Sequence, residues 1–173
     1  MPITVVLFPT ARTAPDTLFP SMKIAIGADH AGYQLKESLK RLLDELGLIY
    51  EDFGTMNGQS VDYPDFAQAV ATGVATGNFD RGILVCGTGV GMAIAANKVH
   101  GVRSAAIVDT DTARLSREHN DLNVLALGAR VLPESRAREI VKTFLQTPFE
   151  GGRHAGRVAK IHAIEPSSTS SGA

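Results

Sequence analysis

The stretch that decides the fold is Gly82-Ile83-Leu84-Val85-Cys86-Gly87-Thr88-Gly89-Val90-Gly91-Met92-Ala93-Ile94-Ala95-Ala96-Asn97-Lys98. It reads as an apolar strand over 82–86, a turn with three glycines, and a helical run of small residues over 88–98. A turn of this kind at a helix N-terminus points backbone N–H groups at one spot, which suits an anion. The same positive helix end lowers the pKa of a thiol held beside it. The pattern therefore joins Cys86, the one cysteine of the chain, to an anion cradle.

The alternation of strand and helix extends through the rest of the chain. Region 33–46, for example, places its leucines on one helical face, and Gly47 ends that helix. Strands are predicted over 23–27, 48–53, 82–86, 102–108 and 124–127, and helices over 33–46, 64–77, 88–98, 110–119, from 133 onward, and over 153–164. This order predicts an α/β fold, a three-layer, doubly wound, Rossmann-like sandwich with a five-stranded parallel sheet.

Composition and charge limit the classes of function. The 173 residues are 44% hydrophobic and 20% charged, with a formal net charge of −1, which gives no general attraction to nucleic acid or anionic membranes. The single cysteine cannot form an internal disulfide, which fits a reducing cytoplasm. No apolar run approaches the roughly 20 residues of a membrane helix. We therefore expect a cytoplasmic protein that binds neither nucleic acid nor membrane.

The two ends of the chain differ from its middle. Residues 1–21 hold four prolines and one basic residue, so we interpret them as a poorly ordered N-terminal arm, with an edge strand over 3–8 as the alternative. Residues 166–173 are rich in serine and cannot bury enough apolar surface to order themselves. The remaining residues, 22–165, are predicted to form a single domain.

Polar residues follow several of the predicted strands. In doubly wound sheets, ligands bind beyond the carboxyl ends of the strands. Asp29-His30 follow the first strand, Cys86 ends the third, and Arg130 follows the fifth. His119-Asn120 end the helix that comes after the fourth strand. We expect these four groups to meet in one crevice, with Asn120 and Arg130 reaching a neighbouring subunit as the alternative.

Each of these signals also has a purely structural interpretation. A lone cysteine after three apolar residues is often a buried small hydrophobe. Asp29-His30 and His119-Asn120 contain residue types that cap helices and form turns. Tyr63, which precedes Pro64, is first interpreted as a packing or capping residue. Only the combination of these residues favours a site.

Two arginines near the C-terminus form a pattern suited to phosphate. Arg153 and Arg157 lie four residues apart, hence on one helical face, and Gly151-Gly152 before them permits close approach of a ligand. Paired guanidinium groups bind phosphate through several directed donors, although exposed arginines are most often only solvated. The five histidines show no metal-ligand spacing, so no metal site is expected.

Six motifs in order, over nearly the whole domain, are far more specific than any one alone. They are Gly27-Ala28-Asp29-His30-Ala31-Gly32, Asp62-Tyr63-Pro64, Cys86-Gly87-Thr88-Gly89-Val90-Gly91, Ala95-Ala96-Asn97-Lys98, His119-Asn120-Asp121-Leu122-Asn123 and Glu150-Gly151-Gly152-Arg153-His154. With these motifs the chain resembles the ribose-5-phosphate isomerase B family, which also holds the galactose-6-phosphate isomerase subunits. The resemblance runs from about Met22 to Glu165.

The resemblance implies an aldose–ketose isomerase that interconverts ribose 5-phosphate and ribulose 5-phosphate in the pentose phosphate pathway, without metal or organic cofactor. It implies that Cys86 is the base that moves a proton between C1 and C2 through an enediolate, and that His119 assists opening of the furanose ring. Members of the family are homodimers or homotetramers with sites between subunits. The implied substrate-binding residues are Asp29, His30, Tyr63, Gly87, Thr88, Gly89, Val90, Gly91, Asn120, Arg130, Arg153 and Arg157.

The resemblance also divides these residues by role. The amides from Gly87 to Gly91, with Asn120, would hold the enediolate oxygens, and Arg130 and the two C-terminal arginines would bind phosphate. Some members carry a different base where this chain has Cys86. Two other functions stay open: an allose- or galactose-6-phosphate isomerase, and a non-catalytic binding module for sugar phosphates. The intact pair of Cys86 and His119 disfavours the binding module, since a binder needs no base.

Overall fold

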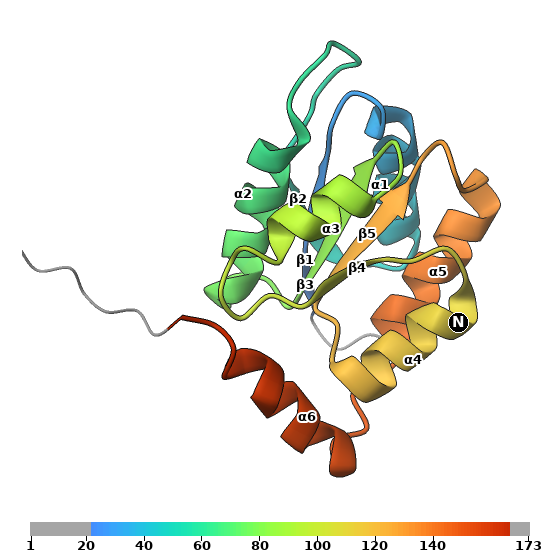
Figure 1. Cartoon of the computed structure of the whole chain (residues 1–173). Helices are drawn as coiled ribbons and strands as arrows, with labels where there is room; N and C mark the ends of the chain where they lie inside the picture. Colours follow the sequence, from blue (N-terminus) through green and yellow to red (C-terminus); the bar gives the residue numbers. More distant parts are fainter. Residues whose placement is uncertain (1–21, 167–173) are drawn as a thin grey trace, which may run out of the picture.

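A five-stranded, entirely parallel sheet forms the centre of the computed structural model, which describes residues 22–166 (Figure 1). The strand order is β2-β1-β3-β5-β4, so β2 and β4 are the edge strands. The strands are β1 (Lys23–Ala28), β2 (Ile49–Asp52), β3 (Arg81–Cys86), β4 (Ser104–Ala106) and β5 (Val124–Gly128). β1, β3 and β5 are apolar and almost completely buried, as expected for strands covered on both faces.

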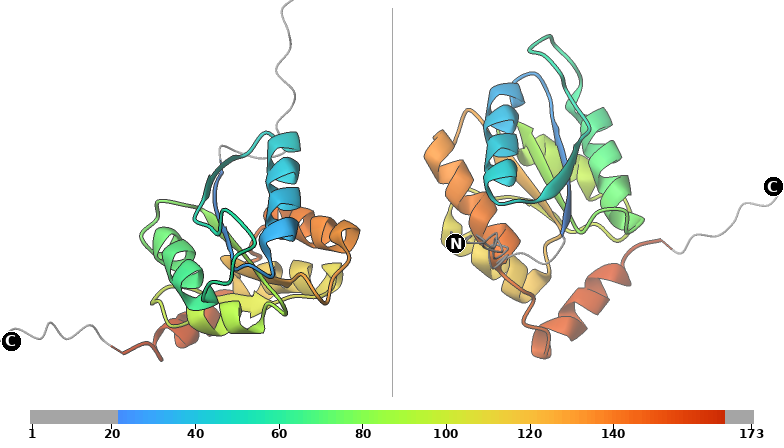
Figure 2. Two further views of the ribbon diagram at one scale, coloured as in Figure 1. Left: turned by 90° about the horizontal axis from the view of Figure 1, so that it is seen from above. Right: turned by 180° about the vertical axis from the view of Figure 1, so that it is seen from behind.

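Helices cover both faces of the sheet, which confirms the predicted three-layer doubly wound sandwich (Figure 2). They are α1 (Tyr33–Glu45), α2 (Tyr63–Ala75), α3 (Val90–Ala96), α4 (Thr110–Asn120), α5 (Glu134–Gln146) and α6 (Arg153–His162). One core cluster joins α1 and α5 to the sheet, and a second joins α2 and α3 to the opposite face. The leucines of α1 enter the first cluster because their helical spacing places them on one face.

Two elements, β4 and α3, differ most from their predicted bounds. The strand expected over 102–108 is reduced to Ser104–Ala106, because β4 pairs only with β5 and the amide of Arg103 bonds instead to the side chain of Asn123 (2.8 Å). The helix expected over 88–98 begins only at Val90, because Gly89 has a left-handed backbone (φ 80°) and belongs to the turn.

α6 differs from the other helices because it extends beyond the three layers (Figures 1 and 2). Among its side chains only His154 is buried. No helix within residues 22–166 is both long and apolar enough to span a membrane. The expectations for residues 1–21 and for 167–173 concern segments outside the described residues.

Candidate active site

The Cys86 turn lies at the carboxyl end of β3, in the middle of the sheet. Cys86 is the last residue of β3 and is only 5% exposed. The left-handed backbone of Gly89 turns its N–H group back toward β3, and this group donates a hydrogen bond to Cys86 Sγ (3.1 Å). A hydrogen bond from a backbone amide at a helix start favours negative charge on sulfur. The turn therefore directs a backbone donor at the sulfur.

Glycines allow the neighbouring loops to approach this turn closely. A Cβ atom at Gly32 would lie 2.3 Å from the carbonyl oxygen of Val85, the residue before the cysteine. Asp29 enters the same space: it is 6% exposed, its amide donates to Val85 O (3.2 Å), and its Oδ1 accepts from the amide of Gly32 (2.9 Å). The structure thus places a buried carboxylate beside the end of β3.

Three further residues that were predicted for the site lie at the carboxyl ends of the strands. Tyr63 packs its ring on the turn, since a Cβ at Gly91 would lie 2.7 Å from that ring. Arg130 covers the turn from the other side, where a Cβ at Gly87 would lie 3.3 Å from its guanidinium. His30 Nδ1 lies 3.3 Å from both the amide and the carbonyl of Val61. We call this set the strand-end cluster. It comprises Asp29, His30, Tyr63, Cys86, the turn from Gly87 to Gly91, and Arg130.

The four groups do not meet within one chain. His119 and Asn120 lie at the amino ends of the strands, opposite Cys86, because α4 runs back past the strand that it follows. The carbonyl of Asn120 accepts a hydrogen bond from Arg103 (3.1 Å), the residue immediately before β4. A parallel strand of six residues is about 16 Å long, and roughly this distance separates the carboxyl ends of the strands from their amino ends. Arg130, by contrast, stays over its own chain's turn.

His119 has its own group of partners at the amino ends of the strands. Its ring stacks on that of His154 with a centroid distance of 4.2 Å and an interplanar angle of 6°. His154 Nε2 lies 3.3 Å from Nε of Arg153 and 3.5 Å from a carboxylate oxygen of Glu150. Arg157 is exposed one turn further along α6. We call this set the strand-start cluster: it comprises His119, Asn120, Glu150, Arg153, His154 and Arg157.

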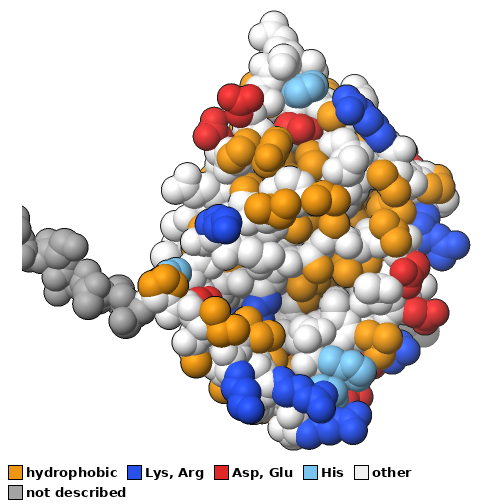
Figure 3. Space-filling model, viewed as in Figure 1, with side chains coloured by type: hydrophobic (Ala, Val, Ile, Leu, Met, Phe, Trp, Pro, Cys, Tyr) orange, Lys and Arg blue, Asp and Glu red, His pale blue; other side chains and the backbone are white. Residues whose placement is uncertain are grey.

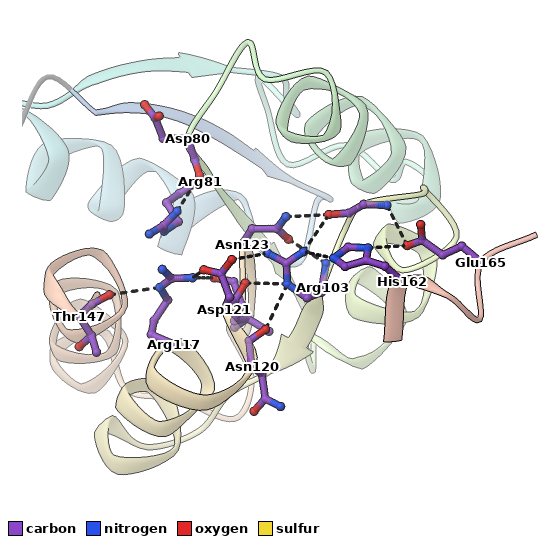
Figure 4. Close-up of polar contacts among 12 residues, drawn as sticks. Asp80, Arg81, Arg103, Arg117, Asn120, Asp121, Asn123, Thr147, His162 and Glu165 are labelled. Atoms are coloured by element: carbon purple, nitrogen blue, oxygen red, sulfur yellow. Dashed lines mark hydrogen bonds and ion pairs between the residues drawn. The ribbon is translucent and has the colours of Figure 1, made fainter. Parts of the chain in front are cut away.

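A polar network joins the end of α4 that carries His119 and Asn120 to the far end of α6, at His162 (Figure 4). Asp121 ends α4 with a left-handed backbone, and its carboxylate bridges Arg103 (2.8 Å) and Arg117 (2.7 Å). Arg103 also bonds His162 of α6 (2.8 Å), and the buried Arg117 donates to the carbonyl of Thr147 (3.2 Å). Burial and the neighbouring Arg117 lower the pKa of Arg81 at the same edge to about 10. These contacts tie the C-terminal end of α4 to the C-terminal end of α6, which lies away from Arg153 and His154.

One group of side chains in the described region offers three nitrogen and carboxylate ligands within 4.8 Å of one another: His119, Glu150 and His154. The two imidazole planes are nearly parallel, so their nitrogen lone pairs do not converge on one point as tetrahedral zinc requires. Arg153 also points a cationic donor at His154 Nε2. The geometry therefore favours an aromatic stack over a metal site.

Two surface grooves lie apart from the reactive sulfur. One, of about 620 Å³, lies between the β2 edge and α2, and includes Ile49 and Phe79. The other, of about 730 Å³, lies between β4 and α6 and includes Asn120 and Ile161. Neither is lined by Cys86 or His119. The candidate site residues therefore lie in two clusters at opposite ends of the strands, and neither Cys86 nor His119 lines either groove.

Sequence reasoning gave no role to Glu150 and His154, although both belong to a quoted motif. The available signal was a histidine directly after Arg153, but its burial depends on the contact between α4 and α6. No local pattern predicts that contact.

The fold and the strand-end cluster define a parallel α/β protein with a cysteine in a glycine-rich turn at the carboxyl ends of the strands. The chain belongs to the ribose/galactose isomerase family, whose model matches residues 24–161. The expected family and the expected class of isomerase are thereby confirmed.

Individual relatives agree with this assignment. The chain is 49% identical to ribose-5-phosphate isomerase B of Escherichia coli over 143 residues, which cover 83% of this chain and 96% of the relative. It is 44% identical to the D-erythrulose-4-phosphate isomerase of Pectobacterium atrosepticum over 145 residues, 83% of this chain and 95% of the relative.

Solved structures match over the same region. Ribose-5-phosphate isomerase B of Clostridium thermocellum is 54% identical with a TM-score of 0.82, covering 83% of this chain and 97% of the other. The Mycoplasma genitalium enzyme with bound ribulose-5-phosphate is 43% identical with a TM-score of 0.80, covering 83% and 95%. These similarities confirm the Rossmann-like fold.

Proposed function

We propose that this chain interconverts ribose 5-phosphate and ribulose 5-phosphate, a step of the pentose phosphate pathway, with Cys86 as the base. The observation that carries the proposal is the hydrogen bond from Gly89 N–H to Cys86 Sγ, in the turn that leads into the N-terminus of α3. The relatives named ribose-5-phosphate isomerase B support the choice of substrate. A phosphorylated pentose as substrate also fits the predicted cytoplasmic location.

The proton transfer follows from this geometry. The Cys86 thiolate removes the proton from C2 of the open-chain aldose, and the negative charge moves to O1, which gives an enediolate. The thiol then returns the proton to C1 while a proton moves from the oxygen on C2 to O1, which gives the ketose. The amides from Gly87 to Gly91 stabilise the developing charge, which is worth about 3–4 kcal/mol per donor in comparable sites. Asp29 and His30 bind sugar hydroxyls beside the turn.

Residues of the strand-start cluster complete the reaction. His119 moves the proton that opens the furanose ring, and Asn120 holds an enediolate oxygen. Arg153 and Arg157 bind the phosphate, together with Arg130 of the strand-end cluster. Phosphate binding at the far end of the sugar orients the reacting carbons, so the binding free energy of a remote group lowers the barrier.

The separation of the clusters requires a second copy of the chain. A two-fold axis perpendicular to the strands reverses the strand direction, so the strand-start cluster of one copy meets the strand-end cluster of the other. Figure 3 shows hydrophobic side chains gathered on the face that carries α3. This face supports an interface, since large exposed apolar patches mark contact surfaces. The exposed apolar residues of α3, α4 and the segments after β4 and β5 are Val90, Ile94, Val108, Leu115 and Val131.

Complementation between two inactive variants tests this arrangement. We expect Cys86→Ala and His119→Ala each to lose isomerisation of ribose 5-phosphate when measured alone. In a refolded equimolar mixture, half of the dimers are hybrids and each hybrid contains one intact site, so roughly a quarter of the wild-type activity returns. A mixture no more active than its components contradicts the composite site. Either variant alone with wild-type activity contradicts the role of that residue.

The number of carbons in the substrate is tested by a panel of aldose phosphates. The relative named D-erythrulose-4-phosphate isomerase favours including a four-carbon sugar, and the alternative of allose or galactose 6-phosphate adds six-carbon sugars. We expect the largest kcat/KM for ribose 5-phosphate, undiminished by a chelator because the scheme uses no metal. A larger kcat/KM for another sugar phosphate would make that sugar the preferred substrate and contradict the proposal. Binding of a sugar phosphate without isomerisation of any would support the non-catalytic binding module.

A further inference from the structure

α6 carries the two arginines proposed to bind phosphate, yet it has few contacts with the rest of the chain. Its only buried side chain is His154, which is 3% exposed. At its other end, α6 is held by the bond from Arg103 to His162 (2.8 Å) and by Glu165, which accepts from the amide of Gly101 (2.8 Å). His154 is therefore the anchor of the end that faces the substrate.

His154 contacts two groups to which the proposed function assigns chemistry. One face of its ring covers the ring of His119, at 4.2 Å and 6°. Its Nε2 accepts a hydrogen bond from Nε of Arg153 (3.3 Å), which leaves the ring proton on Nδ1. The segment before α6 is bonded to α4 at the same place, since the amide of Glu150 donates to the carbonyl of Glu118 (3.1 Å).

The surroundings of His154 keep its ring neutral. Burial lowers its pKa most, and the positive charges of His119 and Arg153 lower it further, while the Glu150 carboxylate opposes them and Arg157 adds a smaller decrease. Only a neutral ring accepts the hydrogen bond from Arg153, because a protonated ring has no free lone pair. Neutrality and the position of Arg153 therefore depend on each other.

We propose that His154 is a positioning residue of the isomerase: its buried ring fixes the plane of His119 and the direction of the Arg153 guanidinium. The inference rests on the proposed function, in which His119 opens the sugar ring and Arg153 binds phosphate. A proton-transfer group and a phosphate donor act only within a narrow range of geometry, so loss of their common support affects both steps. These two contacts can be removed separately, because His119 stacks on the ring of His154 whereas Arg153 donates a hydrogen bond to its Nε2.

Two substitutions separate the two contacts. His154→Phe keeps an aromatic ring against His119 but removes the acceptor for Arg153, so KM for ribose 5-phosphate rises roughly tenfold while kcat stays within about twofold. His154→Gln keeps an acceptor near the position of Nε2 but removes the stack, so kcat falls roughly 10–100-fold with less change in KM. His162→Asn is the matched control: it alters the histidine at the other end of α6 and leaves both constants within about twofold of wild type.

A second measurement isolates the ring-opening step. Ribulose 5-phosphate has no furanose form because its C5 oxygen carries the phosphate, so exchange of its C1 hydrogen with deuterium from the solvent needs Cys86 but no ring opening. We expect His154→Gln to retain this exchange while losing isomerisation of ribose 5-phosphate. Equal loss of both reactions in all His154 variants, or the same loss in His162→Asn, indicates a merely structural role and overturns the proposal. Wild-type constants in His154→Gln overturn it as well.

The contact itself is measurable without activity. Loss of the stacked ring shifts the Cε1–H resonance of His119 in the proton spectrum of His154→Gln, but not in that of His162→Asn. An unshifted resonance overturns the proposal even where the variants fold poorly. A wild-type protein that isomerises no ribose 5-phosphate refutes the proposed function instead, while a shifted resonance still supports the contact.

Discussion

The two ends of the strands carry the two halves of the proposed site, and these halves are built in different ways. At the carboxyl ends of the strands, the contacts are made mainly by main-chain groups: the amide of Gly89 donates to Cys86 Sγ, and the amide of Asp29 donates to the carbonyl of Val85. At the amino ends, the contacts are made by side chains: His119 of α4 stacks on His154 of α6, and Arg103 pairs with Asp121. The first edge is fixed by short loops between buried strands, and the second by contacts between distant segments.

This difference explains why the proposed site falls into two halves within one chain. A strand and its following turn place the proposed base at the carboxyl end of the sheet, whereas the following helix returns the chain to the other end. His119 ends such a helix, so no local rearrangement brings it to Cys86 of the same chain. The comparison between the edges is therefore tested by variants that damage one edge and spare the other.

The largest expected effect comes from removing the proposed base. Cys86→Ala is expected to lower isomerisation roughly 10²–10⁴-fold, because a positioned general base contributes about that factor. It also abolishes exchange of the C1 hydrogen of ribulose 5-phosphate with solvent, as followed by proton NMR. His119→Asn, at the other edge, is expected to lose isomerisation of ribose 5-phosphate and to keep that exchange. If both variants lose, or both retain, the exchange of the C1 hydrogen, the two clusters do not have the separate roles proposed for them.

The arginines proposed to bind phosphate give the next largest effect. Arg153→Gln or Arg157→Gln is expected to raise KM for ribose 5-phosphate roughly 10–100-fold, since a hydrogen bond to a charged group contributes about 1.5–3 kcal/mol. Arg136→Gln on α5 is the matched control, because this arginine is half exposed and pairs with Glu139 on its own helix. Steady-state kinetics distinguish them, and an unchanged KM in both α6 variants contradicts phosphate binding at the strand-start edge.

Glycine substitutions compare the edges through stability. Gly89→Ala and Gly47→Ala both place a side chain on a left-handed backbone (φ 80° and 68°), which costs about 1–2 kcal/mol. A Cβ at Gly89 also lies 3.0 Å from the backbone of Leu127, whereas at Gly47 nothing lies within 4 Å. We expect Gly89→Ala to lose more unfolding free energy in urea and to lower kcat, and Gly47→Ala to leave kcat unchanged. Equal behaviour contradicts a tightly packed active turn.

The smallest expected effect is a pH dependence of stability from the strand-start edge. The pKa of His154 is lower in the folded chain than in the unfolded chain, chiefly because of burial. The unfolded state therefore binds the proton first, so this stabilisation is complete above a pH of about 6.5 and is lost as the pH falls from there through the folded pKa. Urea unfolding of wild type and His154→Phe, at one protein concentration, measures it. A difference between them that does not change with pH contradicts a buried neutral ring.

Much of the strand-end cluster was predictable because its signals are local. The apolar run before Cys86 and the glycines after it predict a strand, a turn and a helix start within ten residues. The structure adds reasons for particular glycines, such as Gly32 beneath Val85, that depend on the adjacent strand. The strand-start cluster was predicted only as separate residues, and within one chain these residues do not meet Cys86.

The sequence by itself determined the order of strands and helices, the parallel sheet and the family, because hydrophobic periodicity, turn residues and short motifs act over a few neighbouring residues. Only the tertiary structure decided that Cys86 and His119 lie at opposite edges and that His154 is buried against His119. These facts depend on the return path of α4 and on the docking of α6 against it. Such contacts join segments far apart in the chain, so no local pattern of residues specifies them.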